Sequence, residues 1–208
     1  MKKILTFVFA LLLMFSLVSC GKVDDNKDKG GNNQETTDPV VEVDKTVSGF
    51  SVESTTKVYL TSIGQADFDI VGNLVDKTSR KDIVKDNLLK ANDVENGSVV
   101  FLVTGSSGKG LGSAGTDINA ENVRAEEFAA AAKEGKFTVV VVHVGGEQRR
   151  GAQADPIIRT VTPAAKLVMV VKTGNADGLF TTLAGSSIPC YSYSRSTKMV
   201  DSFKAILG

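Results

Sequence analysis

Residues 138–142 of this chain read Thr-Val-Val-Val-Val, an unbroken run of β-branched side chains. Such runs are typical of strands that are covered on both faces, as in parallel sheets. Similar apolar runs recur along the chain and predict further strands. These predicted strands are Val58–Thr61, Val99–Val103, Leu167–Val171 and Tyr191–Tyr193, with Ile83–Val84 as a short edge strand.

Helical patterns separate the predicted strands. Ala120–Lys133 is predicted as a helix with Val123, Phe128, Ala131 and Ala132 on one face. Asp155-Pro156 predicts the start of another helix, with Asp as N-cap and Pro at the first helical position. The remaining predicted helices use Phe68, Val71 and Val75 with Ile70 and Leu74 beside them; Leu179, Phe180 and Leu183 after a cap at Asp177; and Val200, Phe203 and Leu207.

This alternation of strands and helices predicts an α/β fold. Because parallel strands need right-handed crossovers, we expect a Rossmann-like or flavodoxin-like three-layer sandwich with a mostly parallel sheet of about five strands. Two smaller α/β lobes are the alternative, which the short chain disfavours.

The N-terminus has the pattern of a bacterial lipoprotein signal peptide. Lys2-Lys3 precede the apolar run Ile4–Leu17, and Leu17-Val18-Ser19-Cys20 matches a lipobox, in which the Cys becomes the lipidated first residue. The alternative is a transmembrane anchor, but this run is shorter than the roughly 20 residues that span a bilayer. We therefore predict lipidation at Cys20.

The chain divides into four predicted segments. Residues 1–19 are the signal peptide, and residues 20–45 are the lipidated Cys followed by a polar, disordered tether. Residues 46–56 form a lead-in arm or strand, and residues 57–208 form a single α/β domain.

Composition narrows the possible partners and cofactors. The chain carries 24 basic and 24 acidic residues, so it lacks the basic excess of nucleic-acid-binding proteins. One His and one Cys besides Cys20 do not supply the ligands that a zinc site needs, so no metal site is predicted. Gly110-x-Gly112-x-x-Gly115 formally matches a dinucleotide fingerprint, but it begins several residues after the strand, and we predict no cofactor.

The long loops follow the strands, which places them together at the carboxyl edge of the predicted sheet. Ligands bind outside this edge in open α/β sheets. The candidate ligand-binding residues in these loops are Gly64, Gln65, Gly105, Ser106, Ser107, Lys109, His143, Glu147, Arg149, Arg150, Asn175 and Asp177.

The chemistry of these loops suggests an acidic ligand group. Arg149 and Arg150 suit a carboxylate or phosphate, and the amides near Gly105–Lys109 suit an anion. Gln65, His143 and Asn175 are expected to recognise polar substituents, and Asp67 or Asp177 to cap helices or contact a cationic part. One alternative is that Glu147 pairs with one Arg and both are solvated. The other is that the glycine-rich segment is a flexible or packed surface loop.

His143 is the only His and the candidate for a general base. The alternative is a His whose ring is satisfied by neighbouring backbone. A triad of Ser106 or Ser107, His143 and Asp117 or Asp155 lacks the G-x-S-x-G elbow. Cys190 follows Pro189 in an apolar strand and is expected to be a buried, inert thiol.

Four motifs resemble those of a bacterial family of exported or lipid-anchored proteins, a domain of unknown function. The resemblance covers about residues 57–208 and implies a Rossmann-like α/β sandwich, without any established activity or catalytic residues. The motifs are Leu60–Gln65, Gly105–Asp117, His143–Gly151 and Gly174–Phe180.

We therefore expect a membrane-tethered, extracytoplasmic lipoprotein of the cell envelope that binds a small polar or anionic solute. A hydrolase or transferase using His143, and a component of a surface complex with a protein partner, are the alternatives. The expected partners are the membrane, through the lipid on Cys20, and the solute; nucleic acid is not one of them.

Overall fold

The computed structural model of this chain describes residues 42–208. Its centre is a six-stranded sheet with the order β2-β1-β3-β4-β5-β6, in which every pair of neighbours is parallel. The strands are β1 (Val58–Ile63), β2 (Val84–Lys85), β3 (Val99–Thr104), β4 (Thr138–His143), β5 (Leu167–Val171) and β6 (Cys190–Tyr193). This is the flavodoxin-like order, extended by one strand.

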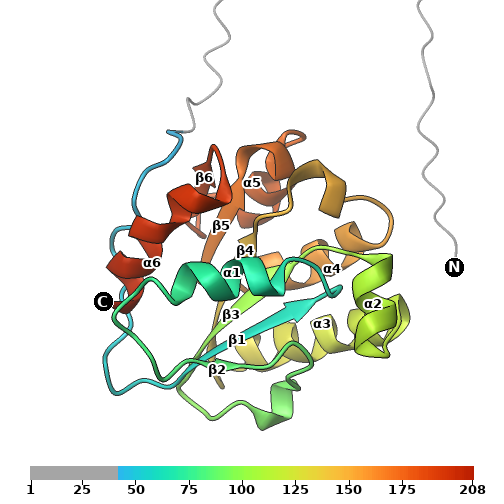
Figure 1. Ribbon diagram of the computed structural model, residues 1–208, viewed down its shortest axis with the longest axis horizontal. Coiled ribbons are helices and arrows are strands. Elements are labelled where there is room, and N and C mark those ends of the chain that lie inside the picture. Colours follow the sequence, from blue (N-terminus) through green and yellow to red (C-terminus); the bar gives the residue numbers. More distant parts are fainter. Residues whose placement is uncertain (1–41) are drawn as a thin grey trace, which may run out of the picture. The chain divides into compact units, whose positions relative to one another are not determined.

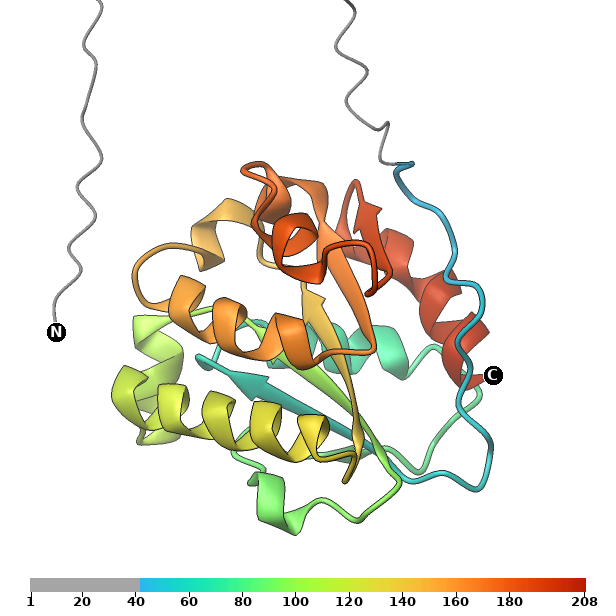
Figure 2. The ribbon, with the colours of Figure 1, turned by 180° about the vertical axis from the view of Figure 1, so that it is seen from behind.

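Helices cover both faces of the sheet, which makes the predicted three-layer sandwich. Helices α1 (Phe68–Val75) and α6 (Val200–Leu207) lie on one face (Figure 1). Helices α3 (Ile118–Lys133), α4 (Ala154–Val161) and α5 (Leu179–Ala184) lie on the other (Figure 2). The remaining helices are α2 (Gly108–Ala114) and the 3₁₀ segments η1 (Ala91–Asp93), η2 (Gly146–Arg149), η3 (Thr162–Ala164), η4 (Lys172–Asn175) and η5 (Ser196–Met199).

The strand sequences explain their position between the two layers. Along β3, Phe101 and Val103 pack into the core beneath α1 and α6, whereas Val100 and Leu102 pack beneath α3 and α4. Because both faces are buried, the strands carry continuous apolar runs rather than an alternation with polar residues.

Two apolar positions that the sequence suggested for helix packing are exposed instead. Val123 is 53% exposed and Ile70 is 45% exposed. The prediction that Val123 shares the buried face of its helix is wrong, because α3 turns Glu121 and Ala125 towards the sheet. Glu121 is fully buried because it binds the loop that follows β1.

Two helix starts also differ from the sequence expectation. The glycine-rich loop contains α2, whose N-cap Ser107 accepts a hydrogen bond from the Gly110 amide at 3.1 Å. Helix α4 begins at Ala154 with Gln153 at the N-cap position, so the prediction of Asp155 as N-cap is wrong. The Asp155 carboxylate instead accepts from the Gly151 amide and from Arg150.

The segment before β1 packs against the domain as an extended arm without forming a regular strand. Val43 makes an isolated parallel bridge with Ser192 of β6, and Asp44 accepts hydrogen bonds from the Ser194 amide and hydroxyl, both at 2.7 Å. Val47 is buried, and Phe50 and Val52 pack against the α1–α6 side of the core. These contacts begin inside the segment 20–45 that was predicted as tether.

The membrane prediction rests on residues outside the described part of the chain. Cys20 and the predicted signal peptide lie there. Within residues 42–208, no helix has the length and apolar character needed to cross a bilayer.

Candidate functional site

The strand order reverses direction at β1, whose neighbours are β2 on one side and β3 on the other. In open α/β sheets this switch point leaves a crevice at the carboxyl ends of the two strands. Here the loops after β1 and β3 contact each other, since Gln65 and Ser106 form an isolated bridge and the Ser107 amide donates to the Gly64 carbonyl at 3.1 Å.

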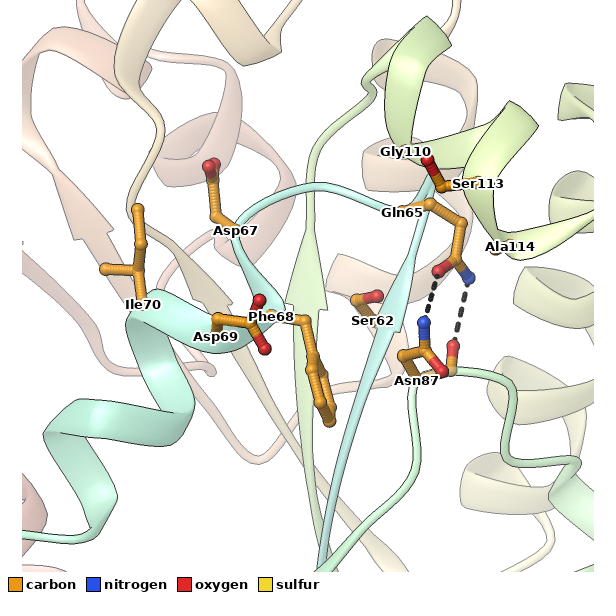
Figure 3. Close-up of a pocket in the computed structure, with 10 residues that line it drawn as sticks. All are labelled: Ser62, Gln65, Asp67, Phe68, Asp69, Ile70, Asn87, Gly110, Ser113 and Ala114. Atoms are coloured by element: carbon orange, nitrogen blue, oxygen red, sulfur yellow. Dashed lines mark hydrogen bonds between the residues drawn. The ribbon is translucent and has the colours of Figure 1, made fainter.

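A cavity of about 330 Å³ lies beside this switch point (Figure 3). It is formed by the end of β1, the start of α1, the loop after β2 and one side of α2, and we call it the switch-point cavity. Its lining residues are Ser62, Gln65, Asp67, Phe68, Asp69, Ile70, Asn87, Gly110, Ser113 and Ala114.

Two buried polar atoms of this lining have no hydrogen-bond partner within the protein. They are Ser62 Oγ and Asp67 Oδ2. Ser62 is fully buried, and the Asp67 side chain is 6% exposed. Buried polar atoms are nearly always paired in native proteins, so an unpaired one invites a functional explanation.

The remaining wall is held in place by the Gln65 side chain. Its amide nitrogen donates to the Asn87 carbonyl at 2.9 Å, and its amide oxygen accepts from the Asn87 side chain at 3.2 Å (Figure 3). On the α2 side, a Cβ at Gly110 would overlap the Gln65 carbonyl oxygen. This position requires glycine for α2 to approach the β1 loop.

A buried ion pair lies behind the switch point. Glu121 Oε2 accepts from the Gly64 amide at 2.8 Å and from the Gln65 side chain at 3.2 Å, and Glu121 Oε1 pairs with Arg124 at 2.8 Å. Arg124 also donates to the Leu89 carbonyl at 2.8 Å. The Gly64 amide therefore already binds a carboxylate of the protein itself.

Arg149 connects the β4 loop to the switch point. Its Nε lies 3.3 Å from Asp67 Oδ1, and its carbonyl accepts from the Ser106 amide at 3.2 Å. The Arg149 side chain is 37% exposed, so part of its guanidinium faces solvent.

Arg150, in contrast, is the centre of an internal cluster. It makes five hydrogen bonds, to both carboxylate oxygens of Asp155, both of Asp177 and the Gly174 carbonyl, and it lies over the Phe180 ring. Burial lowers the pKa of Arg150, but its bonds to Asp155 and Asp177 outweigh this and raise it. The cluster therefore uses the whole guanidinium inside the protein.

A second cavity, of about 370 Å³, lies beside the Arg150 cluster between the β4 and β5 loops. Its lining residues are Glu147, Arg150, Gly151, Asp155, Thr173, Ala176 and Asp177. Arg150 holds the pKa of Asp177 below its usual value. Burial raises the pKa of Asp155, but its bonds to Arg150 and the Gly151 amide lower it overall.

His143 is fully buried and lines neither cavity. Its Nδ1 lies 2.8 Å from the Thr104 carbonyl oxygen and its Nε2 lies 3.0 Å from the Gly146 carbonyl oxygen. Burial lowers the pKa of His143, although both carbonyls act in the opposite direction. Both ring nitrogens thus face neighbouring backbone rather than a cavity, which is close to the alternative that the sequence had left open.

The other candidates hold loops or face solvent. Asn175 Oδ1 accepts from the Phe180 amide at 2.8 Å at the start of α5, and Ser106 Oγ donates to Gln153 at 3.1 Å. Lys109 and Glu147 are exposed. Cys190 is partly buried, and burial raises its pKa to about 12, which keeps the thiol protonated.

The comparison with protein families agrees with the resemblance seen in the sequence. The family described as Domain of unknown function (DUF6305) matches residues 55–207. The chain belongs to this family. No curated protein and no solved structure matches the chain.

The structure brings most predicted site residues of the DUF6305 domain to two places, whereas His143 and Asn175 line neither cavity. Gly64, Gln65, Gly105, Ser106 and Arg149 lie at the switch point. Glu147, Arg150 and Asp177 line the second cavity.

Sequence reasoning missed four residues of the switch point, namely Ser62, Asn87, Glu121 and Arg124. Ser62 lies in the Leu60–Gln65 motif that the sequence analysis identified, but nothing in the sequence indicates that its hydroxyl is unpaired. Glu121 and Arg124 have the i,i+3 spacing of an ordinary surface pair, which hides their burial.

Proposed function

We propose that the DUF6305 domain of this chain is a binding module that holds a small polar solute in the switch-point cavity. The observation that carries this proposal is the fully buried Ser62 hydroxyl, which lies on the cavity wall and has no partner in the protein. An unpaired buried hydroxyl costs roughly 1–3 kcal/mol, and a solute that bonds to it recovers this free energy.

The composition of the wall supports a polar solute. The Asn87 side chain and the Ser113 hydroxyl offer polar groups, and Phe68 and Ile70 offer apolar surface. The Gln65 amide nitrogen is bonded to the Asn87 carbonyl and to Glu121 and shapes the wall instead. Binding sites for small molecules combine apolar surface with a few positioned polar groups in this way. The rigid sheet edge and the Gln65–Asn87 bonds keep these groups in place before a solute binds.

An acidic solute group finds less support at this place. Among the described residues, no Lys, Arg or His lines the switch-point cavity. The Gly64 amide is bonded to Glu121, and the guanidinium of Arg150 is used by Asp155 and Asp177. The proposal therefore keeps the polar solute of the sequence analysis and does not assign its anionic part to this cavity.

The proposed location is the extracytoplasmic face of a membrane, with the domain anchored through a lipid on Cys20. The lipobox Leu17–Cys20 supports this location. Metabolic labelling with a fatty acid should mark the wild-type chain in bacterial cells and leave the Cys20→Ala variant unmarked. Equal labelling of both chains would contradict the anchor.

The binding proposal is tested by screening polar solutes with thermal shift and native mass spectrometry. We expect stabilisation by at least one solute class, lost in Ser113→Trp, because an indole on exposed Ser113 fills the cavity from α2. Ser187→Trp, at an exposed turn outside both cavities, is the matched control. Binding that survives Ser113→Trp would place the solute elsewhere.

A second test separates function from stability at two buried serines. Ser62→Ala removes an unpaired hydroxyl, so the free energy of unfolding should stay constant or rise while solute binding weakens. Ser202→Ala removes an acceptor of the Val47 amide at 3.0 Å and the Tyr193 hydroxyl at 2.7 Å, and should cost about 1–2 kcal/mol. A Ser62→Ala variant with unchanged binding would argue against a role for this hydroxyl.

A further inference from the structure

We infer that the solute of the switch-point cavity is a neutral polyol, such as a sugar or a sugar alcohol, and that one of its hydroxyls bonds to the Ser62 hydroxyl. This inference rests on the proposed binding function and adds the chemical class of the solute. Three observations support it: the neutral polar group at the buried end of the cavity, the donors and acceptors beside that group, and the apolar surface that completes the wall.

The buried end of the cavity carries a neutral polar group. Ser62 lines the cavity and is fully buried, and its hydroxyl has no hydrogen-bond partner within residues 42–208. A hydroxyl both donates and accepts hydrogen bonds, so a hydroxyl of the solute can bond to it in either direction. A charged group of the solute at this place would lose its hydration without gaining a counter-charge.

The buried carboxylate of Asp67 does not supply this counter-charge, because both of its oxygens face the β4 loop. Its Oδ1 lies 3.3 Å from Arg149 Nε, and its Oδ2 faces Gly145, where a Cβ would overlap it. The other acidic lining residue, Asp69, is exposed in the first turn of α1 (Figure 3). The carboxylate of Asp69 therefore lies on the solvent side of the cavity, where it can accept hydrogen bonds from solute hydroxyls.

Asn87 adds a polar group beside Ser62. Arg124 donates to the main-chain carbonyls of both residues, at 3.3 Å to Ser62 and at 3.4 Å to Asn87, which holds them next to each other. The Asn87 amide nitrogen donates to Gln65 at 3.2 Å, which leaves the Asn87 amide oxygen as an acceptor (Figure 3). Ser113, exposed on α2, adds a second hydroxyl. The wall thus offers both donors and acceptors to a solute with several adjacent hydroxyls.

Phe68 and Ile70 give the cavity apolar surface as well. The carbon faces of a sugar ring are apolar and their C–H bonds are weakly positive, so they pack well against the negative face of an aromatic ring. The cavity volume of about 330 Å³ lies near the lower end of the range for small-molecule sites, which is roughly 300–1,000 Å³. A single sugar ring or a short sugar alcohol is a solute of this size.

The first test compares sugars of one shape that differ in charge. It uses the full chain, purified in a detergent without a sugar headgroup. The probes are glucose with glucosamine and glucuronate, galactose with galactosamine and galacturonate, and the neutral polyols myo-inositol and xylitol. Isothermal titration is expected to show binding of at least one neutral probe, with no tighter binding of its charged counterparts, because neither charge finds a partner beside Ser62. Disaccharides that end in the same sugar form a separate arm, which distinguishes a free sugar from the end of a glycan.

The second test combines Ser62→Ala with deoxy sugars. Ser62→Ala should weaken binding of the parent sugar by roughly three- to tenfold, through the loss of one hydrogen bond. One monodeoxy analogue already lacks the hydroxyl that bonds to Ser62, so the wild type and Ser62→Ala should bind this analogue equally. Ser187→Ala, at an exposed turn outside both cavities, is the matched control and should bind every probe like the wild type.

The possible results separate this inference from the proposed function. A charged sugar bound about tenfold more tightly than its neutral counterpart would overturn the neutral polyol. The same effect of Ser62→Ala on every deoxy analogue would overturn the bond to Ser62. Binding of another polar solute that is lost in Ser113→Trp, with no sugar or polyol bound, would overturn the inference and keep the binding module. If no solute in the wider screen needs the cavity, the proposed function fails as well.

Discussion

At the scale of single residues, His143 carries a conflict that its surroundings do not resolve. Both ring nitrogens face carbonyl oxygens, at 2.8 and 3.0 Å, but a neutral imidazole has one N–H to donate. The doubly protonated ring would satisfy both carbonyls, whereas complete burial disfavours its charge and lowers the pKa of His143. The neutral His143 ring thus lies between two carbonyl acceptors, although only one of its nitrogens can donate.

The lowered pKa of His143 predicts that the domain loses stability in mild acid. The unfolded chain takes up the proton near pH 6.5, and the folded chain does so at a lower pH. Between these values the unfolded state binds more protons, so the free energy of unfolding falls as the pH falls. As this is the only His, its single NMR titration curve should show a midpoint below 6.5.

A His143→Gln variant provides the comparison, because the Gln amide still offers N–H donors and cannot titrate in this range. Its melting temperature should change less than that of the wild type between pH 7 and pH 5.5. A His143 midpoint at or above 6.5 would show that the two carbonyls outweigh the burial.

At the scale of elements, α2 forms one wall of the switch-point cavity, although its glycine content disfavours a helix. Its seven residues include Gly108, Gly110 and Gly112, and Leu111 is its one buried residue. Each glycine lowers helix stability by roughly 0.5–1 kcal/mol relative to alanine. Packing against the β1 loop must therefore hold this helix in place.

Two neighbouring glycines of α2 should respond to alanine in opposite directions. Gly112→Ala meets no atom within 4 Å and should raise the free energy of unfolding by about 0.5–1 kcal/mol. Gly110→Ala would overlap the Gln65 carbonyl and should lower it by about 1–3 kcal/mol while displacing α2 from the cavity. Urea unfolding measures both, and equal effects would contradict the close approach.

The Arg150 cluster joins three elements, η2, η4 and α4, through one guanidinium. Arg150→Lys keeps the charge but cannot bond Asp155 and Asp177 together, so it should cost about 2 kcal/mol in urea unfolding. Arg159→Lys, on the exposed side of α4, should change stability by less than about 0.5 kcal/mol. If Arg150→Lys weakened solute binding and left the free energy of unfolding unchanged, Arg150 would instead be a ligand-binding residue.

The elements that the sequence predicted well are those decided by local pattern. The β-branched runs of β3, β4 and β5 predict buried parallel strands. This prediction needs only the side chains of consecutive residues. The contacts of Arg150 and Glu121 depend instead on loops from distant parts of the chain. The sequence indicates which groups an Arg can bind. It does not indicate that Asp155 and Asp177 already bind the Arg150 guanidinium within the protein.

At the scale of the whole domain, the arm that precedes β1 covers part of the sheet edge formed by β6. Edge strands expose unpaired backbone groups to other chains. The Val43–Ser192 bridge and the Asp44 amide, which donates to the Ser192 carbonyl at 2.9 Å, cover part of the outer edge of β6. Asp44 holds the arm in this position. Hydrogen bonds from the Ser194 amide and hydroxyl to the Asp44 carboxylate lower the pKa of Asp44.

Loss of the Asp44 carboxylate should therefore uncover the β6 edge. In Asp44→Ala, hydrogen exchange at the Asp44 and Ser194 amides should become faster, while amides of β3 and β4 keep their wild-type rates. Glu42→Ala removes an exposed ion pair with Lys45 and should leave these rates unchanged. Unchanged exchange in Asp44→Ala would show that Val43 and Val47 hold the arm without it.

The path of the arm also determines where a mechanical load enters the domain. A pull on the chain ahead of Glu42 meets the β6 edge first, at Ser192 and Ser194, and then α6, where the Val52 amide donates to the Ile206 carbonyl at 2.8 Å. These anchors come before β1, so tension is carried by the β6 side of the sheet. With the proposed lipid on Cys20 as the anchor, drag on the domain would load these contacts before the loops that follow β1 and β3.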